Sequence, residues 1–288
     1  MNTKYISTDE LVKKRVITHG SVSNKPVEGS RVHLFIEDLD ISNKIDLNEF
    51  HSEILNGKSN VIITVDEILS EIDRQIERAI KWMGENETAI INITLPSLLP
   101  KIEECNESIQ FKATVIKHEP FKPIWEWTPE EKYERAAKYK EMAVELVRQN
   151  RIKDAFNRFS KAVKIIISLE PIDDLELNST LYTNLYKLRT SIYNNMAICQ
   201  LKFNNYDHTI NLCTKVLNRD KNNVKAMYRR GCAFGGNKNV EQAMKDFERI
   251  VHIEPTNFAA REKLKIYSEL WSEAKKRSDE LLKKMFPI

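Results

Sequence analysis

The strongest constraint on the fold is a set of small and aromatic residues that recurs at fixed spacing in the second half of the chain. The first copy is Ala143, Ala155 and Phe159. The same spacing recurs in Gly231, Ala243 and Phe247, and in more degenerate form in Ala197, Thr209 and Cys213. Small side chains at such positions let two helices pack closely. The pattern therefore predicts a stack of helix pairs.

The distance between copies identifies the type of repeat. The step from Ala197 to Gly231 equals the period of the tetratricopeptide repeat (TPR), a pair of helices about 34 residues long. The step from Ala143 to Ala197 is longer than one period by about 20 residues, and we assign the extra length to 171–188. We expect this insertion to lengthen the facing helices and their loop. The prediction is three repeats, at about 136–169, 190–223 and 224–257, within a helical region that covers 130–257.

Both ends of the helical region carry their own signals. Residues 120–129 hold three prolines and two tryptophans, which predicts a stiff, extended linker. Thr128, Pro129 and the two glutamates that follow are typical of a helix N-cap and first turn. Beyond Pro255, residues 258–288 predict a long charged helix whose apolar stripe caps the last repeat. A calmodulin-target helix is the alternative interpretation of this segment.

The first half of the chain has a different texture. Runs rich in β-branched residues predict strands at 31–37, 60–65, 89–95 and 108–117. Apolar residues at helical spacing over 66–83 predict a single helix between the second and third of these strands. We therefore expect residues 11–119 to form an antiparallel sheet with one helix packed across it, after a flexible, polar segment at 1–10. The predicted fold class is α+β followed by all-α.

Charge is distributed unevenly along the chain. The net charge of +3 divides into −5 for residues 1–124 and +8 for residues 125–288. A basic second half suits an acidic partner, although long helices also need charged solvent faces. The basic residues are interspersed with acids, which argues against nucleic acid, and no apolar run is long enough to suggest a membrane span. The four cysteines suggest buried thiols in a reducing compartment, so we expect a location in the cytoplasm, with the nucleus as a second location. We also expect the protein to be a monomer.

The titratable residues form no pattern that suggests chemistry. The six histidines and four cysteines have neither metal-ligand nor nucleophile spacing, and Gly57-Lys58-Ser59 lacks the upstream glycine of a phosphate-binding loop. We therefore expect no metal and no cofactor.

Several motifs resemble one family across nearly the whole chain. In the second half they are Thr128-Pro-Glu-Glu-Lys132, Tyr193-Asn-Asn-Met-Ala-Ile-Cys199, Val224-Lys-Ala-Met-Tyr-Arg-Arg-Gly231 and Leu281-Leu-Lys-Lys-Met-Phe286. In the first half the likeness is fainter and is carried by Val12-Lys-Lys-Arg-Val-Ile17, Ile76-Glu-Arg-Ala-Ile-Lys-Trp-Met83 and Phe111-Lys-Ala-Thr-Val-Ile116. Together they resemble the large TPR-bearing immunophilins, the FK506-binding-protein family. The likeness is nearest to the divergent branch called FK506-binding protein-like.

The resemblance implies a first domain related to enzymes that rotate X-Pro bonds, a step with an uncatalysed barrier of about 18–20 kcal/mol. The family binds the twisted amide in an aromatic pocket, with a Trp on the helix as its floor. Here the floor position is Ile76 and the strand tyrosine position is Ile36. The loop at 96–108 is short and has no Tyr, while Asp46 and Phe111 match pocket positions. The departures predict a degenerate domain without appreciable isomerase activity.

The TPR half suggests a binding groove. The first helix of each repeat lines the concave face of such arrays, and counting from the small residues places four polar side chains there: Lys140, Asn195, Lys225 and Arg229. By resemblance these positions match a two-carboxylate clamp that holds the C-terminal tail (Met-Glu-Glu-Val-Asp) of the ninety-kilodalton heat-shock chaperone. The family often has an Asn one helical turn after the first Lys, whereas this chain has Val144. We therefore expect a working but weakened clamp.

Three functions remain open at this point. The leading hypothesis is a co-chaperone adaptor that docks the chaperone through its groove and a client through its first domain. The second is an active prolyl isomerase targeted by its TPR module. The third is a scaffold whose groove holds another acidic tail, such as that of the seventy-kilodalton chaperone or of a small-RNA pathway factor.

Overall fold

The computed structural model describes residues 4–22, 25–41, 52–94, 108–119 and 121–285. The chain divides into two compact units, Met1–Pro123 and Ile124–Ile288, and each is treated by itself. Asp46 and nearly all of the loop at 96–108 lie outside the described residues, so the expectations about them stay predictions.

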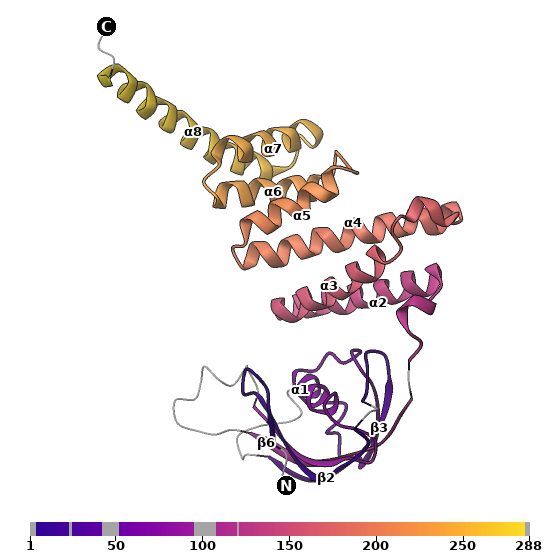
Figure 1. Cartoon of the computed structure of the whole chain (residues 1–288). Coiled ribbons are helices and arrows are strands. Elements are labelled where there is room, and N and C mark those ends of the chain that lie inside the picture. The colour runs from indigo at the N-terminus through magenta and orange to yellow at the C-terminus, as the bar shows by residue number, and fades with distance from the viewer. Residues whose placement is uncertain (1–3, 23–24, 42–51, 95–107, 120, 286–288) are drawn as a thin grey trace. The chain divides into compact units, whose positions relative to one another are not determined.

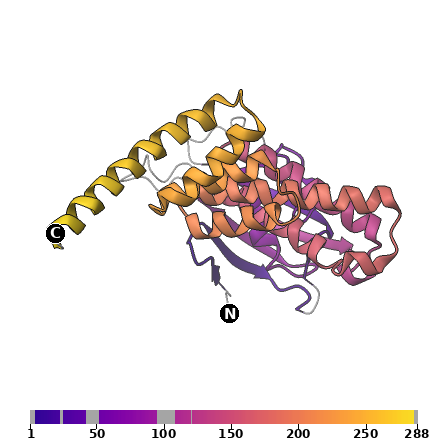
Figure 2. The same ribbon diagram turned by 90° about the horizontal axis from the view of Figure 1, so that it is seen from above.

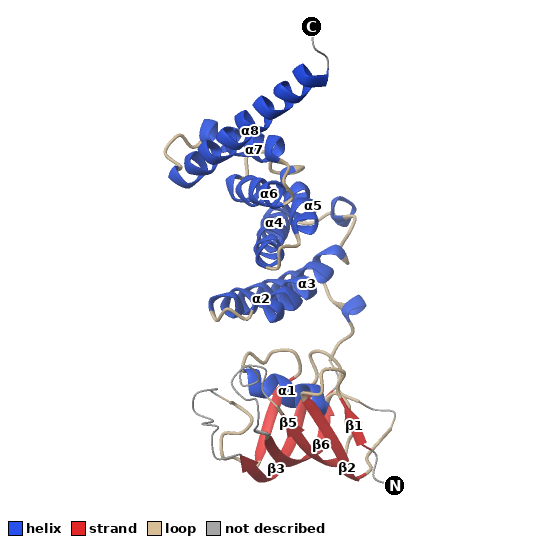
Figure 3. Ribbon diagram, turned by 90° about the vertical axis from the view of Figure 1, so that its left-hand side faces the viewer, coloured by secondary structure: helices blue, strands red, loops and turns tan. Residues whose placement is uncertain are grey.

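In its described residues, the first unit is an antiparallel sheet crossed by one helix (Figure 3). Its strands are β1 (Lys4–Ile6), β2 (Val12–Thr18), β3 (Arg31–Ile41), β4 (Asn60–Thr64), β5 (Thr88–Ile93) and β6 (Ile109–Glu119), and its helix is α1 (Glu71–Ile80). The strands are ordered β1-β2-β5-β6-β3-β4, and every neighbouring pair is antiparallel. This confirms the predicted sheet with one helix.

Alternation along the strands explains where the core lies. In β5, Ala89, Ile91 and Ile93 are fully buried, whereas the residues between them are half-buried. Ile72, Ile76 and Ile80 of α1 recur at helical spacing and are also fully buried. The sheet and the helix therefore share one apolar layer.

The N-terminal segment differs from the expectation that residues 1–10 are flexible. Lys4–Ile6 forms the edge strand β1, which pairs with β2 in the register Lys4–Arg15 to Ile6–Lys13. All of the side chains of this short strand are exposed. A strand this short and solvated leaves no hydrophobic pattern in the sequence, because its pairing is decided by the backbone of β2.

The second unit is helical, as the periodic small residues predict (Figure 1). Its elements are the 3₁₀ turns η3 (Ile124–Glu126) and η4 (Ile172–Leu175) and the helices α2 (Pro129–Arg148), α3 (Ile152–Ile167), α4 (Ser179–Lys202), α5 (Tyr206–Leu217), α6 (Val224–Gly236), α7 (Val240–Ile253) and α8 (Phe258–Met285). Helix α2 begins as expected, because the Thr128 hydroxyl accepts from the Glu131 amide and the Glu131 carboxylate accepts from the Thr128 amide.

The repeated small residues lie where paired helices touch. Ala143 on α2 is fully buried, and so are Ala155 and Phe159 on its partner α3. In the third pair a Cβ added to Gly231 would lie 2.9 Å from the Phe247 ring, so a larger residue there would force α6 and α7 apart. These contacts build three helix pairs, α2–α3, α4–α5 and α6–α7.

The inserted segment enlarges only one helix. Helix α3 ends at Ile167, and the chain then forms η4 before α4 begins at Ser179. Asn178 caps α4 by accepting from the Leu181 amide at 2.7 Å. Helix α4 therefore has 24 residues, whereas its partner α5 has 12. The expectation that the facing helices lengthen is met by α4 alone.

Helix α8 follows the last pair and extends well beyond it (Figure 2). Tyr267 stacks on Phe247 with ring centroids 5.6 Å apart and planes 7° apart, which docks the start of α8 on α7. From Ser268 to Leu282 every residue of α8 is exposed. No helix in the described residues is both long enough and apolar enough to span a membrane.

Candidate functional site

The second unit contains a groove of about 890 Å³ along α4 and the start of α6. Its lining comes from η4, from one stripe of α4, from the turn between α5 and α6, and from α6 itself. The lining residues are Asp173, Tyr182, Thr183, Tyr186, Lys187, Thr190, Ser191, Asn194, Asn195, Arg219, Asp220, Asn223, Lys225 and Arg229. All of these side chains carry a polar group, and two of them are aromatic.

Three of the four predicted clamp residues meet in this groove. Asn195 comes from α4, and Lys225 and Arg229 come from successive turns of α6. Lys140 lies half-buried on α2 and does not belong to the lining of this groove among the described residues. Val144, one turn later on α2, is half-buried as well.

Arg229 is the most unusual side chain of the groove. Its Nη1 is buried and has no hydrogen-bond partner within the described part of the chain. Desolvation by burial lowers the pKa of Arg229. A buried guanidinium N–H without an acceptor is unfavourable unless a partner supplies one, and a carboxylate is the best acceptor for it.

The neighbouring arginine has a different role, although the sequence alone cannot separate the two. Arg230 donates from Nε and Nη2 to the Asp246 carboxylate at 2.8 and 2.7 Å. This bidentate pair joins α6 to α7 and uses the charge of Arg230 inside the fold. Arg229, one residue earlier, lines the groove instead.

Amide side chains form the part of the groove between α4 and α6. Asn223 caps α6 by accepting from the Ala226 amide at 3.0 Å, and the same oxygen accepts from Asn194 Nδ2 at 3.3 Å. Asn194 is buried, and its Oδ1 has no partner among the described residues. The groove therefore offers an unsatisfied acceptor in addition to the unsatisfied donor of Arg229.

The insertion is visible in the sequence, but its role in the groove is not. Tyr182 and Tyr186 lie on the N-terminal turns of α4 and line the groove together with Arg219 of the α5–α6 turn. The sequence feature that indicates this role is the four-residue spacing of Tyr182, Tyr186, Thr190 and Asn194. This spacing places the four side chains along one stripe of α4 that ends beside Asn195.

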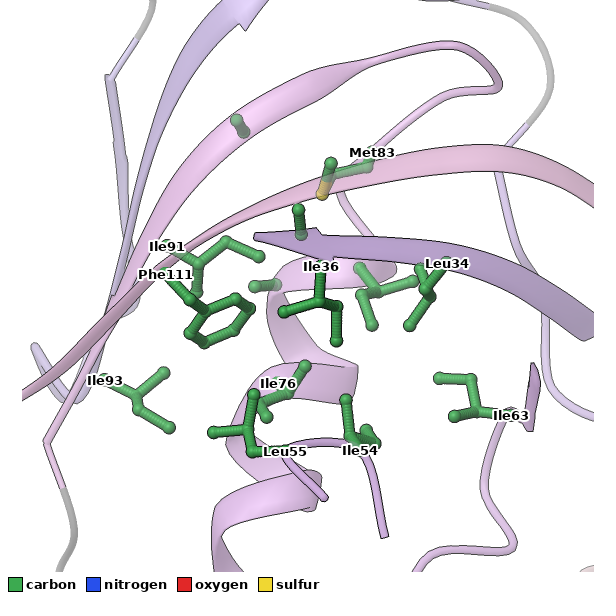
Figure 4. Close-up of a cluster of buried hydrophobic side chains, with 14 of the residues drawn as sticks. Leu34, Ile36, Ile54, Leu55, Ile63, Ile76, Met83, Ile91, Ile93 and Phe111 are labelled. Carbon is green, nitrogen blue, oxygen red and sulfur yellow. The ribbon is translucent and has the colours of Figure 1, made fainter. Parts of the chain in front are cut away.

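The predicted isomerase positions in the first unit lie inside its core. Ile76 and Phe111 are fully buried, and Ile36 is 8% exposed. Figure 4 shows these side chains close together, with Ile54 and Leu55 packed below Ile36 and beside Ile76. Apolar side chains thus fill the layer between α1 and the sheet.

A sheet of this kind followed by a TPR array defines the class of TPR-containing FKBP-like proteins. Residues 5–120 match the family described as "BDBT FKBP like N-terminal", and residues 128–211 match the family "Bride of doubletime-like, TPR domain". The chain belongs to these TPR-containing FKBP-like proteins.

Individual relatives agree with this assignment. The chain is 25% identical over 284 residues to the human peptidyl-prolyl cis-trans isomerase FKBP4, in a match that covers 96% of this chain but 59% of FKBP4. It is 30% identical over 140 residues to the mouse FK506-binding protein-like, covering 49% of this chain and 37% of that protein. The C-terminal TPR-containing domain of a Plasmodium falciparum FK506-binding protein is 28% identical with a TM-score of 0.50, and the match covers 54% of this chain and 99% of that domain.

Proposed function

We propose that this chain is a co-chaperone adaptor whose TPR groove binds the acidic C-terminal tail of the ninety-kilodalton heat-shock chaperone. The observation that carries the proposal is the meeting of Asn195, Lys225 and the partly unsatisfied Arg229 in one groove. A chain terminus that ends in Asp offers two carboxylates close together, and convergent donors are what such a group requires.

The chemistry assigns each donor a task. Asn195 donates to the main-chain carboxylate, where a neutral amide gives direction without adding repulsion between cations. Lys225 pairs with the side-chain carboxylate, and Arg229, which lines the groove, bonds the peptide just upstream through its guanidinium. Lys140, on α2, is proposed as a further donor that completes the clamp when a peptide is bound. Because Val144 supplies no amide, one charge-assisted hydrogen bond is missing, which costs roughly 1.5–3 kcal/mol.

The first unit is proposed to serve as a contact surface for a client protein and to lack appreciable isomerase activity. The filled layer around Ile36, Ile76 and Phe111 supports this, because catalysis of X-Pro rotation needs an open pocket that complements the twisted amide.

Calorimetry on the full chain with the pentapeptide Met-Glu-Glu-Val-Asp tests the clamp. Lys225→Ala should weaken binding at least tenfold, which is about 1.4 kcal/mol. Lys221→Ala is the matched control, because Lys221 is an exposed lysine just before α6 that does not line the groove. Equal affinities of wild type and Lys225→Ala would refute the assignment. Tighter binding of a tail from the seventy-kilodalton chaperone would identify a different acidic partner.

A further inference from the structure

We propose that Tyr182, Tyr186 and Arg219 form a specificity subsite for the peptide residues that precede the acidic C-terminus. These three residues are called the aromatic shelf below. The inference rests on the proposed function, because it extends the same groove from the clamp toward the inserted turns of α4. The insertion thus gives the groove a preference for peptides that have an apolar side chain next to an acidic one.

The shelf is held rigid by one carboxylate. Asp173 of η4 accepts from the Tyr182 hydroxyl at 2.7 Å and from the Tyr186 hydroxyl at 3.2 Å. The two rings pack edge to face with centroids 4.6 Å apart. Tyr182 is nonetheless 37% exposed, so its ring is presented to the groove while its hydroxyl is fixed. An ordered aromatic surface of this kind binds apolar groups at low entropic cost.

Arg219 supplies the charge of the shelf. Its guanidinium carbon lies 4.4 Å from the centre of the Tyr186 ring, and it enters no salt bridge within the described residues. Stacking on a ring fixes the plane of a guanidinium and leaves its N–H edge available to a carboxylate. Asp173 also lines the groove, but its Oδ1 already accepts from both tyrosines. An acidic side chain of the peptide is therefore the fitting partner of Arg219.

The length of α4 sets which peptide residues reach the shelf. The groove is lined along α4 from Tyr182 to Asn195, through Tyr186, Thr190 and Asn194. At about 1.5 Å of helix rise per residue, Tyr182 and Asn195 are separated by about 20 Å along the axis. An extended peptide advances about 3.3 Å per residue, so about six residues span this distance. By the same count Tyr186 lies about 14 Å from Asn195, so the shelf contacts about the fifth to the seventh residue from the C-terminus.

Ten-residue peptides with the same five C-terminal residues test the subsite on the full chain. Their upstream halves contain Phe-Glu, Phe-Lys or only Ala next to the common pentapeptide. Calorimetry near 150 mM salt, where long-range charge effects are screened, should show the Phe-Glu peptide binding wild type fivefold to tenfold more tightly than the Ala peptide. Tyr186→Ala should remove that advantage, so that the variant binds the Phe-Glu and Ala peptides with equal affinity.

Charge reversal provides the sharper readout. Arg219→Glu should invert the preference between the Phe-Glu and Phe-Lys peptides, an effect that loss of folding cannot produce. Lys221→Glu reverses a nearby charge outside the groove and should leave the preference unchanged. Equal binding of the Phe-Glu and Ala peptides, or an unchanged preference in Arg219→Glu, overturns the shelf while the clamp stands. If no peptide binds, including the bare pentapeptide, the proposed function fails and the shelf fails with it.

Discussion

Arg230 on α6 and Asp246 on α7 form a two-point salt bridge, with Nε–Oδ2 and Nη2–Oδ1 distances of 2.8 and 2.7 Å. The Asp246 side chain is 7% exposed and that of Arg230 is 23% exposed. The hydrogen bonds to Asp246, which outweigh the effect of burial, raise the pKa of Arg230. The pair thus fixes the third repeat and determines which of two adjacent arginines is available to a ligand.

Removing the acid of this pair should destabilise the helical unit. Asp246→Ala leaves a partly buried guanidinium without its partner, and we expect a loss of about 3 kcal/mol in the free energy of unfolding. Urea titration followed by far-UV circular dichroism measures it. The matched control is Glu241→Ala, which breaks the exposed Glu241–Lys245 pair on the same helix and should change stability by less than about 1 kcal/mol. Similar losses in both variants would show that the Arg230–Asp246 pair has no special role.

The first unit should not accelerate X-Pro isomerisation. Ile36 and Ile76 stand where the family has aromatic pocket residues, and Ile76 and Phe111 are fully buried among the apolar side chains of the core. A protease-coupled isomerisation assay on the full chain should give the uncatalysed rate. Human FKBP4 serves as the parallel sample. A rate close to that of an active isomerase would contradict the proposal.

The stability of the wild-type protein relative to the Asp73→Asn variant should increase as the pH falls. Burial raises the pKa of Asp73, although hydrogen bonds from Ser52 Oγ and, at 2.6 Å, from the Glu53 amide oppose the shift. Because the folded-state pKa lies above the unfolded value of about 3.9, the stabilisation is complete below that value and is lost as pH rises through the folded pKa. Urea titrations of wild type and Asp73→Asn between pH 4 and 7 measure the difference, and a carboxyl titration by NMR gives the pKa directly. A pH-independent difference, or a folded pKa at or below about 3.9, would be the contrary result.

Two thiols of the helical unit should be inert while it is folded. Burial raises the pKa of Cys199 to about 11 and that of Cys213 to about 12, and both side chains are fully buried. At pH 8 the thiolate fraction of Cys213 is then about one in ten thousand. Alkylation followed by peptide mass spectrometry should label both residues only in denaturant. Rapid labelling of either residue in the native protein would show that the α4–α5 pair opens locally.

The architecture of the two halves was predictable because each fold has a strong period. The spacings that begin at Ala143, Ala197 and Gly231 define three helix pairs, since a helix interface accepts only small residues where backbones approach. Alternation in β3, β5 and β6 defines a sheet in the same way. Counting along those helices predicted that Asn195, Lys225 and Arg229 face the groove, and the structure gathers these three into one groove.

Other features have no such signal. The edge strand β1 is exposed and depends on the backbone of β2, so its side chains carry no pattern. The insertion at 171–188 is visible as extra length, but its geometry depends on Asp173 reaching two tyrosines of the following helix. The place of Lys140 outside the lining likewise depends on how α2 packs beside α4.

The sequence by itself determined the repeat period and the sheet with a helix packed across it, and it predicted polar side chains on the groove side of the repeats, because these features depend on local spacing. Only the tertiary structure decided how the charges are used. Arg229 and Arg230 are chemically identical neighbours, and the difference arises because α7 brings Asp246 to one of them and nothing in the described chain to Nη1 of the other. Pairing between distant residues is a property of packing, and here it ties Arg230 to α7 and leaves Arg229 to line the groove.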